Sequence, residues 1–299
     1  MDIEFFKTLL HVVDGGSMAE AARRVGVTPA AVAQQMQAIE RELGTAVFTR
    51  AGRTVIPTEA GHRVIERARN LVRDYGELKD FALQGEPVGE LRIGTITTAL
   101  LTVMPDVLAH FSKRFPQVKL LIRGGQTPEL FETLKAGDID VAVCLLPPFD
   151  LPKTFEWRLL REEPIVVLAP RALAGRDPDD LLRTEPFIRY DRTLGGGRNA
   201  EEYLRSRRIV PRELFELNSI LTIAMMVDRG LGVALVPDIE SPLLASLDIV
   251  KLTPPGPVAP RRFGLLWRRA SPKSRLIQGL LETAQMTMRS LRGAGGADV

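Results

Sequence analysis

Hydrophobic residues near the N-terminus recur at helical spacing in two short stretches. The first stretch starts at Ser17 and ends at Gly26, and the second starts after Thr28. The small residues Ala21 and Ala22 would let the two helices cross closely. We expect the apolar positions to form a small core: Val25, Val27, Val32, Met36, Ile39 and Leu43. The pattern therefore predicts two short helices joined by a tight turn.

Capping residues mark the ends of both helices. Ser17 can accept from the third backbone N–H of the first helix, and Glu20 can reach back in a capping box. Gly26 suits the left-handed backbone that ends a helix. Thr28 and Pro29 open the second helix with a hydroxyl cap and a proline whose missing N–H costs nothing there. Two helices so joined form a helix-turn-helix, which presents a helix to the DNA major groove, although an ordinary helical hairpin is the alternative.

The start of the second helix carries short or amide-bearing side chains outside the expected core. Such side chains can approach a base edge. Together with Ser17 they are our candidate DNA-contacting residues in this segment: Thr28, Pro29, Ala30, Ala33, Gln34 and Gln37.

A hairpin of two short strands about a glycine turn is predicted at residues 47–57. Arg50 and Arg53 flank the turn, so we expect a wing whose arginines reach the DNA backbone or the minor groove. Arg50 could instead be structural and pair with a carboxylate such as Glu42. A helix-turn-helix followed by such a wing is much less common by chance than the helix pair alone. The combination favours DNA binding.

A long amphipathic stretch follows the wing, and we expect a helix of about 39 Å over residues 59–84. Thr58 can cap this helix, and Glu59 suits its first turn. Its apolar residues recur at close to heptad spacing: Val64, Ile65, Ala68, Leu71, Val72, Tyr75, Leu78, Phe81 and Ala82. We expect this stripe to pair with the same helix of a second chain, and packing within the monomer is the alternative.

Two glycines and a proline in residues 84–90 indicate a hinge. Beyond it, apolar runs that suit strands alternate with helical patterns. Strands are predicted at 91–96, 118–122, 139–145, 165–168, 232–236 and 263–267. Helices are predicted at 98–115, 128–135, 200–207, 219–229 and 273–289. The alternation predicts a mostly parallel sheet covered by helices, followed by a disordered tail at 294–299.

The composition is that of a globular protein of 299 residues, enough for two domains, with 45% hydrophobic and 26% charged residues. The net charge of +3 is a weak signal for any partner. The single cysteine, Cys144, lies in an apolar run and is expected in a buried strand. We see no membrane-spanning run and no signal peptide, which favours the cytoplasm.

Catalytic chemistry has no recognisable motif in the chain. The histidines His11, His62 and His110 stand far apart, without metal-ligand spacing or a nucleophile motif near them. The HExxH, GxSxG and dinucleotide fingerprints are absent. We therefore expect neither an enzyme nor a cofactor or metal site. A solute-binding protein without DNA function is the remaining alternative, but it leaves the winged helix unexplained.

With these segments placed, the sequence resembles the LysR-type transcriptional regulators over essentially the whole chain. The N-terminal residues that carry the resemblance include Gly16-Ser17, Ala21-Ala22, Val27-Thr28, Ile39-Glu40, Glu42-Leu43-Gly44 and Thr58-Glu59-Ala60-Gly61. The C-terminal ones include Gly94-Thr95, Ala136-Gly137-Asp138-Ile139-Asp140 and the segment from Arg229 to Pro237. Many members have an arginine where this chain has Gln34, which bears on base preference rather than on DNA binding.

The resemblance implies an α/β protein with an N-terminal winged helix-turn-helix, a long linker helix and a C-terminal effector domain resembling periplasmic binding proteins. We expect a DNA-binding domain at 1–58, a dimerising linker helix at 59–86 and an effector-binding domain at 87–293. The family layout implies two effector subdomains, at about 90–164 with 266–292 and at about 165–265. The implied partners are double-stranded DNA, a small-molecule effector and further copies of the chain, in a homodimer or homotetramer.

Ligands of open α/β sheets bind outside the carboxyl ends of the strands. Hydroxyls and free N–H groups at a helix start suit an anion such as a carboxylate. The polar residues at such positions are our candidate effector-binding residues: Thr95, Thr97, Thr98, Gln126, Arg192, Asn218 and Ser219.

Each of three candidates has a purely structural alternative. Thr98 would be a helix cap, Gln126 would bridge backbone groups, and Arg192 would pair with Glu185 or Glu201. The three glycines at 195–197 are expected in a solvent loop rather than a phosphate site, because the lysine and hydroxyl of a P-loop are missing.

Overall fold

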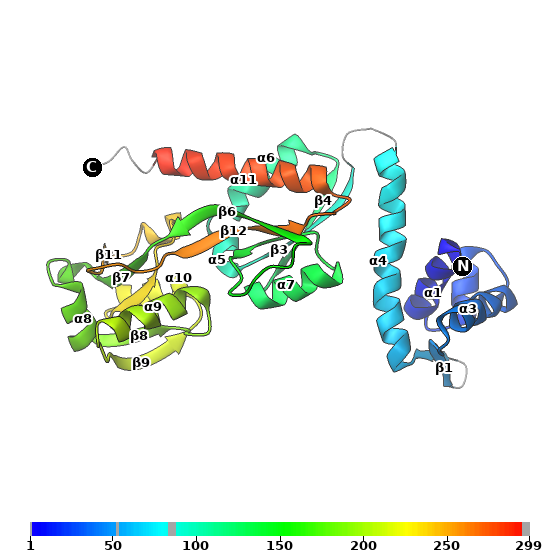
Figure 1. The fold of residues 1–299 in the computed structure, drawn as a ribbon, viewed down its shortest axis with the longest axis horizontal. Coiled ribbons are helices and arrows are strands. Elements are labelled where there is room, and N and C mark those ends of the chain that lie inside the picture. The colour runs from blue at the N-terminus through cyan, green and yellow to red at the C-terminus, as the bar shows by residue number, and fades with distance from the viewer. Residues whose placement is uncertain (1, 52–53, 83–87, 295–299) are drawn as a thin grey trace. The chain divides into compact units, whose positions relative to one another are not determined.

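The structure is a computed structural model that describes residues 2–51, 54–82 and 88–294 (Figure 1). The chain divides into two compact units, Met1–Gly89 and Glu90–Val299. Among the helices of the described ranges, none combines the length and apolarity needed to cross a bilayer.

The N-terminal unit contains three helices, a hairpin and a long fourth helix. Their bounds are α1 Ile3–Gly15, α2 Met18–Val25, α3 Pro29–Leu43, β1 Phe48–Ala51, β2 Thr54–Pro57 and α4 Glu59–Ala82. The predicted helix-turn-helix is α2 and α3, and the predicted wing is the antiparallel pair of β1 and β2. Helix α1 was not predicted. It supplies Leu9 and Val12, which are fully buried in the core of this unit.

The predicted core positions are only partly buried. Val32, Met36 and Ile39 are buried as expected. Val27 and Leu43 were predicted in the core but are 37% and 41% exposed, so this expectation is wrong. Val27 lies in the turn between two helices, and Leu43 is the last residue of α3, so the helical spacing no longer directs either side chain inward.

The first part of the α4 stripe packs within its own unit. Ile65 and Ala68 are buried in the core that α1, α2 and α3 share. This corrects the expectation that the whole stripe faces a second chain. Leu71 and Tyr75, further along the helix, are exposed. The side chains of Leu78 and Phe81 lie outside the described residues.

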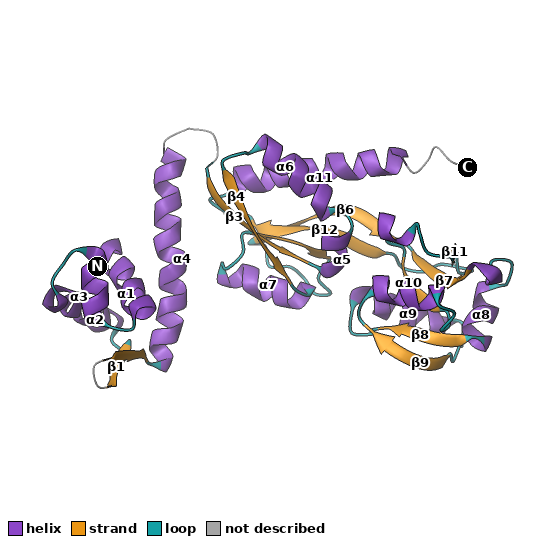
Figure 2. Ribbon diagram, turned by 180° about the vertical axis from the view of Figure 1, so that it is seen from behind, coloured by secondary structure: helices purple, strands orange, loops and turns teal. Residues whose placement is uncertain are grey.

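The C-terminal unit contains a five-stranded sheet in the order β4-β3-β5-β12-β6. Its strands are β3 Gly89–Thr95, β4 Val118–Gly124, β5 Val141–Leu145, β6 Phe155–Glu163 and β12 Arg261–Arg268. Helices α6 (Met104–Arg114) and α11 (Ser274–Ala294) lie side by side along one face, and α7 (Thr127–Ala136) lies on the other (Figure 2). Their apolar faces and the sheet form one core.

The rest of this unit is built on a three-stranded sheet, β10-β7-β11, and a two-stranded sheet of β8 and β9. The strand bounds are β7 Ile165–Pro170, β8 Pro186–Tyr190, β9 Arg212–Leu217, β10 Ala234–Pro237 and β11 Ile249–Leu252. The helices are α8 Pro178–Thr184, α9 Gly195–Ser206 and α10 Ile220–Asp228, with short 3₁₀ turns at Arg171–Leu173 and Pro242–Leu244. Two further cores lie on either side of these strands.

The expected parallel pairing holds for β3 with β5 and for β8 with β9. However, the sheets are mixed. In the five-stranded sheet β3, β5 and β6 share one direction, as expected, and β12 runs antiparallel to β5 and β6, while β10 and β11 run antiparallel to β7. The physical reason is the chain path. After β6 the chain leaves the five-stranded sheet, and it returns through β12 from the opposite direction (Figure 1).

Candidate DNA interface and effector cavity

Helix α3 presents its candidate DNA-contacting side chains outward. Gln34 and Gln37 are exposed, and Ala33, which precedes Gln34, is half-buried. The first residues of the helix are also exposed: Thr28, Pro29 and Ala30. Since Val32, Met36 and Ile39 of the same helix are buried, the opposite face is free to enter a groove.

The caps of the two helices are those that the sequence predicts. Ser17 Oγ accepts from Glu20 N at 3.2 Å, and Thr28 Oγ1 accepts from Ala31 N at 3.2 Å. Gly26 has a φ of 76°, which places it in the left-handed region. The expected return contact of Glu20 in a capping box is wrong, because its carboxylate is bound by the guanidinium groups of Arg23 and Arg24. These contacts lower the pKa of Glu20, Arg23 being the first cause.

One carboxylate connects α3 to the wing. Glu40 Oε1 accepts from Val47 N at 2.8 Å and from Phe48 N at 3.1 Å. On the other side, Thr58 Oγ1 donates to Ala46 O at 2.7 Å and caps α4 by accepting from Gly61 N. The base of the wing is therefore bound to both neighbouring helices.

The arginines of the wing fall where the structure gives no side-chain description. Arg53 lies outside the described residues, and so does the side chain of Arg50. The alternative pairing of Arg50 with Glu42 is likewise outside them. What the structure describes is the hairpin that carries both arginines, from Phe48 paired with Pro57 to Ala51 paired with Thr54.

A cavity of about 190 Å³ opens in the C-terminal unit. Five of the seven candidate effector residues line it: Thr97, Thr98, Gln126, Asn218 and Ser219. Apolar lining comes from Ile96, Pro128, Leu145, Leu146 and Pro148. The cavity thus joins an apolar wall to a set of hydroxyl and amide groups, which is the usual construction of a small-molecule site.

Four helices begin at this cavity. The residues that precede α5 (Thr97–Leu101), α7, α9 and α10 all line it: Ile96, Gln126, Leu194 and Ser219. Ser219 caps α10 by accepting from Thr222 N at 3.3 Å, whereas α5, α7 and α9 have no side-chain cap. Backbone N–H groups at a helix start lack intrahelical acceptors and carry a partial positive charge. The cavity is consequently suited to an anion.

Two candidate residues do not line the cavity. Thr95 is fully buried in β3, where its hydroxyl contacts Ile96 O at 3.4 Å. Arg192 is exposed and donates to Glu216 and Glu213. Arg192 thus pairs with carboxylates, as its structural alternative predicted, but these carboxylates belong to β9 and not to Glu185 or Glu201.

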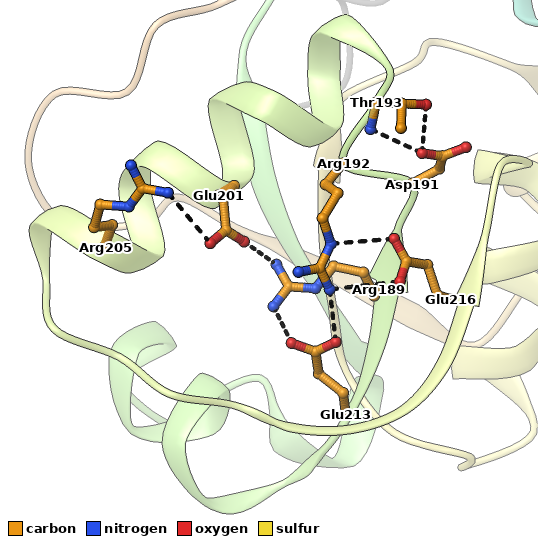
Figure 3. A network of polar contacts seen from close by, with 8 residues as sticks. All are labelled: Arg189, Asp191, Arg192, Thr193, Glu201, Arg205, Glu213 and Glu216. Carbon is orange, nitrogen blue, oxygen red and sulfur yellow. Dashed lines mark hydrogen bonds and ion pairs between the residues drawn. The ribbon is translucent and has the colours of Figure 1, made fainter.

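Arg192 belongs to a charged network on β8, β9 and α9 (Figure 3). Arg189 Nη1 donates to Glu201 Oε2 at 2.7 Å, and its other terminal nitrogen donates to Glu213. Arg192 Nη2 reaches the second oxygen of Glu213 at 2.9 Å. The hydrogen bond from Arg189 is the main cause that lowers the pKa of Glu213. The arginines and glutamates of the network neutralise one another, and Arg192 is ion-paired with carboxylates of the protein itself.

The alternatives for Thr98 and for the three glycines are wrong. Thr98 is the second residue of α5 rather than its cap. The predicted helix at 98–115 is in fact split, with α6 starting at Met104. The glycines at 195–197 open α9, and an added Cβ at Gly197 would lie 2.0 Å from Asp191 O. Close packing, not solvent exposure, requires glycine there. Gln126 precedes α7 without capping it through its side chain.

Tyr190, Arg198 and Arg261 also line the cavity and were not among the candidates. Arg198 is exposed, and its Nη1 donates to Thr193 O at 2.6 Å. Tyr190 and Arg261 are buried, at 4% and 3% exposure. Both residues end or begin strands that come to the cavity from distant parts of the chain, and no local sequence signal marks them.

The single cysteine is a strand residue, as predicted. Cys144 is fully buried in β5, and burial raises the pKa of its thiol to about 12. Within the described ranges, no group of histidine, cysteine, aspartate or glutamate side chains is arranged to hold a metal ion.

Comparison with known proteins agrees with both units. The family profile of the bacterial regulatory helix-turn-helix proteins of the lysR family matches residues 3–62, and that of the LysR substrate binding domain matches residues 84–289. The HTH-type transcriptional regulator IlvR of Caulobacter vibrioides is 29% identical over 291 residues, covering 94% of this chain and 96% of the relative. The uncharacterized HTH-type transcriptional regulator YybE of Bacillus subtilis is 27% identical over 287 residues, covering 94% of each.

Solved structures share the fold over nearly the full length. A full-length OxyR variant from Pseudomonas aeruginosa has a TM-score of 0.65 at 22% identity, covering 96% of this chain and 95% of that one. Full-length CbnR in complex with its target DNA has a TM-score of 0.61 at 21% identity, covering 96% and 100%. These findings support a regulator and not the alternative of a solute-binding protein without DNA function. The chain belongs to the LysR family of DNA-binding transcriptional regulators, with an N-terminal helix-turn-helix domain and a C-terminal effector-binding domain.

Proposed function

We propose that this regulator reads DNA bases with α3 and changes its activity when a small carboxylate binds in the 190 Å³ cavity. The observation that carries the effector class is the meeting of helix starts at the cavity, three of which, those of α5, α7 and α9, have no side-chain cap. A carboxylate there would accept from backbone N–H groups that otherwise need water.

The cavity also limits the size of the effector. Its volume lies below the range of about 300–1,000 Å³ that drug-sized ligands occupy. Leu145, Leu146 and Pro148 would contact an apolar body, while Thr97 and Asn218 would bind polar atoms. An organic acid of a few carbon atoms satisfies both the volume and the lining.

On DNA, we assign base contacts to Gln34 and Gln37, supported by their exposure on α3. A glutamine side chain matches the N6 and N7 edge of adenine in the major groove. Arg50 and Arg53 are proposed to contact phosphate or the minor groove from the wing. Ser17 and Thr28 would then act mainly by fixing the helix starts, because both hydroxyls accept from backbone N–H groups.

We further propose that the chain acts as a homodimer or homotetramer in the cytoplasm, where its DNA lies, and that it has no catalytic activity. The exposed Leu71 and Tyr75 on α4 support dimerisation, because an apolar stripe on a helix favours pairing. Two copies would also match the two half-sites that regulators of this kind usually bind.

The effector proposal is tested with Thr98→Val, which keeps the shape of the side chain and removes its hydroxyl. Small organic acids are screened by thermal shift on the full-length protein, and each hit is added to a DNA gel shift. We expect the variant to bind DNA like the wild type without the acid and to respond more weakly with it. Equal responses of the variant and the wild type would contradict a role for Thr98. A screen in which no acid shifts the melting temperature would contradict the effector class.

A further inference from the structure

Two buried polar side chains that line the cavity come from strands far apart in the sequence. Tyr190 is the last residue of β8, and Arg261 is the first residue of β12. Both line the cavity and are 4% and 3% exposed. Burial raises the pKa of the Tyr190 phenol, and the charge of Arg261, the next largest cause, opposes this rise. Polar groups that are this buried usually serve either a structural network or a ligand.

The charges around Arg261 do not balance. Arg161 and Arg261 both donate to one buried carboxylate, that of Glu163, so two guanidinium groups share a single negative charge. The other nearby carboxylate, of Glu240, is 56% exposed and lies 3.5 Å from Arg161. Arg261 therefore shares its buried carboxylate with a second guanidinium group.

Two nitrogens of Arg261 contact the same carboxylate oxygen. The Nε atom donates to Glu163 Oε2, and the buried Nη2 forms an ion pair with the same oxygen without making a well-aligned hydrogen bond. A buried cation that shares its only buried carboxylate with a second guanidinium is incompletely neutralised, and an anion placed beside it would add negative charge. The cavity that Arg261 lines is the space in which such an anion can lie.

We propose that Tyr190 and Arg261 form the anion subsite of this cavity and bind the carboxylate of the effector. The assignment rests on the proposed function and deepens it by naming the residues that carry specificity for an acid. The carboxylate would lie between the Arg261 guanidinium, the Tyr190 hydroxyl and the uncapped start of α9.

The environment of Tyr190 supports its role as a donor. Burial is the main cause that raises the pKa of this phenol, so the hydroxyl keeps its proton at neutral pH. A protonated phenol can donate to a carboxylate, whereas a phenolate would repel it. The backbone at the subsite is also held in place, since Asn199 Nδ2 of α9 donates to Ala259 O at 2.8 Å, two residues before Arg261.

The subsite lies where the chain passes between the five-stranded sheet and the rest of the C-terminal unit. Arg261 and Glu163 are paired residues at the ends of β12 and β6, the strands through which the chain leaves and re-enters the five-stranded sheet (Figure 1). An acid that binds Arg261 would therefore act on the same ion pair that connects these two strands. If the acid binds more tightly in one arrangement of these strands than in another, its binding favours that arrangement.

The test uses the full-length protein, with benzoate and isobutyrate as probes and benzamide and isobutyramide as their neutral counterparts. Binding is measured by calorimetry and thermal shift at constant ionic strength. We expect an acid, but not its amide, to bind the wild type. Tyr190→Phe removes only the hydroxyl and should weaken acid binding by about tenfold, the usual effect of losing a hydrogen bond to a charged group.

A second variant removes the charge of Arg261 without leaving Glu163 unpaired. The double substitution Glu163→Gln with Arg261→Gln replaces the ion pair by two amides, and far-UV circular dichroism checks the fold. We expect it to lose acid binding by tenfold or more. Arg192→Gln is the matched control, since Arg192 pairs with Glu213 and Glu216 and does not line the cavity, and it should bind acids like the wild type.

The outcomes separate this assignment from the proposed function. Acid binding that is unchanged in Tyr190→Phe and in a folded double variant would overturn the anion subsite and leave the cavity as an effector site. Amide binding equal to acid binding would do the same. If neither the acids nor the amides bind, both the subsite and the proposed effector class are overturned.

Discussion

Gln34 and Gln37 are the side chains through which we propose that α3 distinguishes one DNA sequence from another. They lie nearly one helical turn apart on the exposed face, opposite the buried Val32 and Met36. Their amides offer both a donor and an acceptor, and the adenine edge presents the complementary pair. A residue of this kind contributes to affinity for a matched site and little to affinity for random DNA.

Replacing Gln34 by alanine should cost roughly 1–3 kcal/mol of binding free energy at a selected DNA site, the typical value for one bidentate base contact. Fluorescence anisotropy on selected and random duplexes at one salt concentration measures both affinities. Gln35→Ala is not a suitable control, because Gln35 is half-buried; Arg41→Ala, on the exposed last turn, is better. An equal loss on both duplexes would show that Gln34 contacts only the backbone.

Cys144 illustrates how burial determines the reactivity of a side chain. The thiolate is the reactive form, and burial raises the pKa of this thiol to about 12. We predict that Ellman's reagent does not label the folded protein at pH 8 over minutes and labels one thiol per chain in guanidinium chloride. Rapid labelling of the folded protein would contradict the position of Cys144 in β5.

At the scale of elements, the wing depends on a single carboxylate for its attachment to α3. Glu40 accepts from two consecutive backbone N–H groups, those of Val47 and Phe48. Because Val47 is fully buried, its N–H has no access to water if this acceptor is lost. The position of the hairpin relative to the recognition helix follows from these two bonds.

Glu40→Ala should therefore destabilise the N-terminal unit by about 1–3 kcal/mol, the cost of leaving a buried donor unsatisfied. It should also weaken binding to all DNA sequences, because the wing loses its orientation. Chemical denaturation and anisotropy measure the two effects. Glu42→Ala, on the exposed end of the same helix, serves as a comparison. Unchanged stability in Glu40→Ala would mean that the bonds do not hold the wing.

The middle of α4 is where we expect two chains to meet. Leu71 is 47% exposed, so Leu71→Glu should leave the monomer folded while burying a carboxylate in the dimer interface. Sedimentation velocity should show a smaller species. Leu243→Glu makes the same change at another exposed leucine and should leave the mass unchanged. A full-size species for Leu71→Glu would place the interface elsewhere.

The local elements could be predicted because their signals are local. Ser17, Thr28 and Pro29 fix helix starts within one turn of chain, and the structure has the same starts. The direction of β12 could not be predicted, since it depends on how the chain returns after about a hundred residues. Val27 was misplaced for a related reason, as helical spacing does not continue through a turn.

The cavity shows the same division between local and distant information. Thr97, Thr98 and Ser219 could be named because each stands at the start of a helix that the sequence predicts. Arg192 was chosen for its charge, but its partners lie on β9, a strand that the pattern does not indicate. Arg261 was not identified because the residue that pairs with it, Glu163, is 98 positions away in the sequence.

At the scale of the whole molecule, two compact units carry two tasks. The N-terminal unit holds the helix that faces DNA, and the C-terminal unit holds the cavity. A ligand can change the activity of such a protein only if it binds one arrangement of the molecule more tightly than another. Sequence-specific DNA binding is the property on which the account depends, because any effector response must be expressed through it.

The most direct test compares the affinity of the full-length protein for a duplex obtained by in vitro selection with its affinity for a scrambled duplex of equal length. Both dissociation constants are measured by anisotropy at the same near-physiological salt concentration. We predict that the selected duplex binds at least about a thousandfold more tightly, as DNA sites of specific regulators do. Equal dissociation constants for the two duplexes would contradict it.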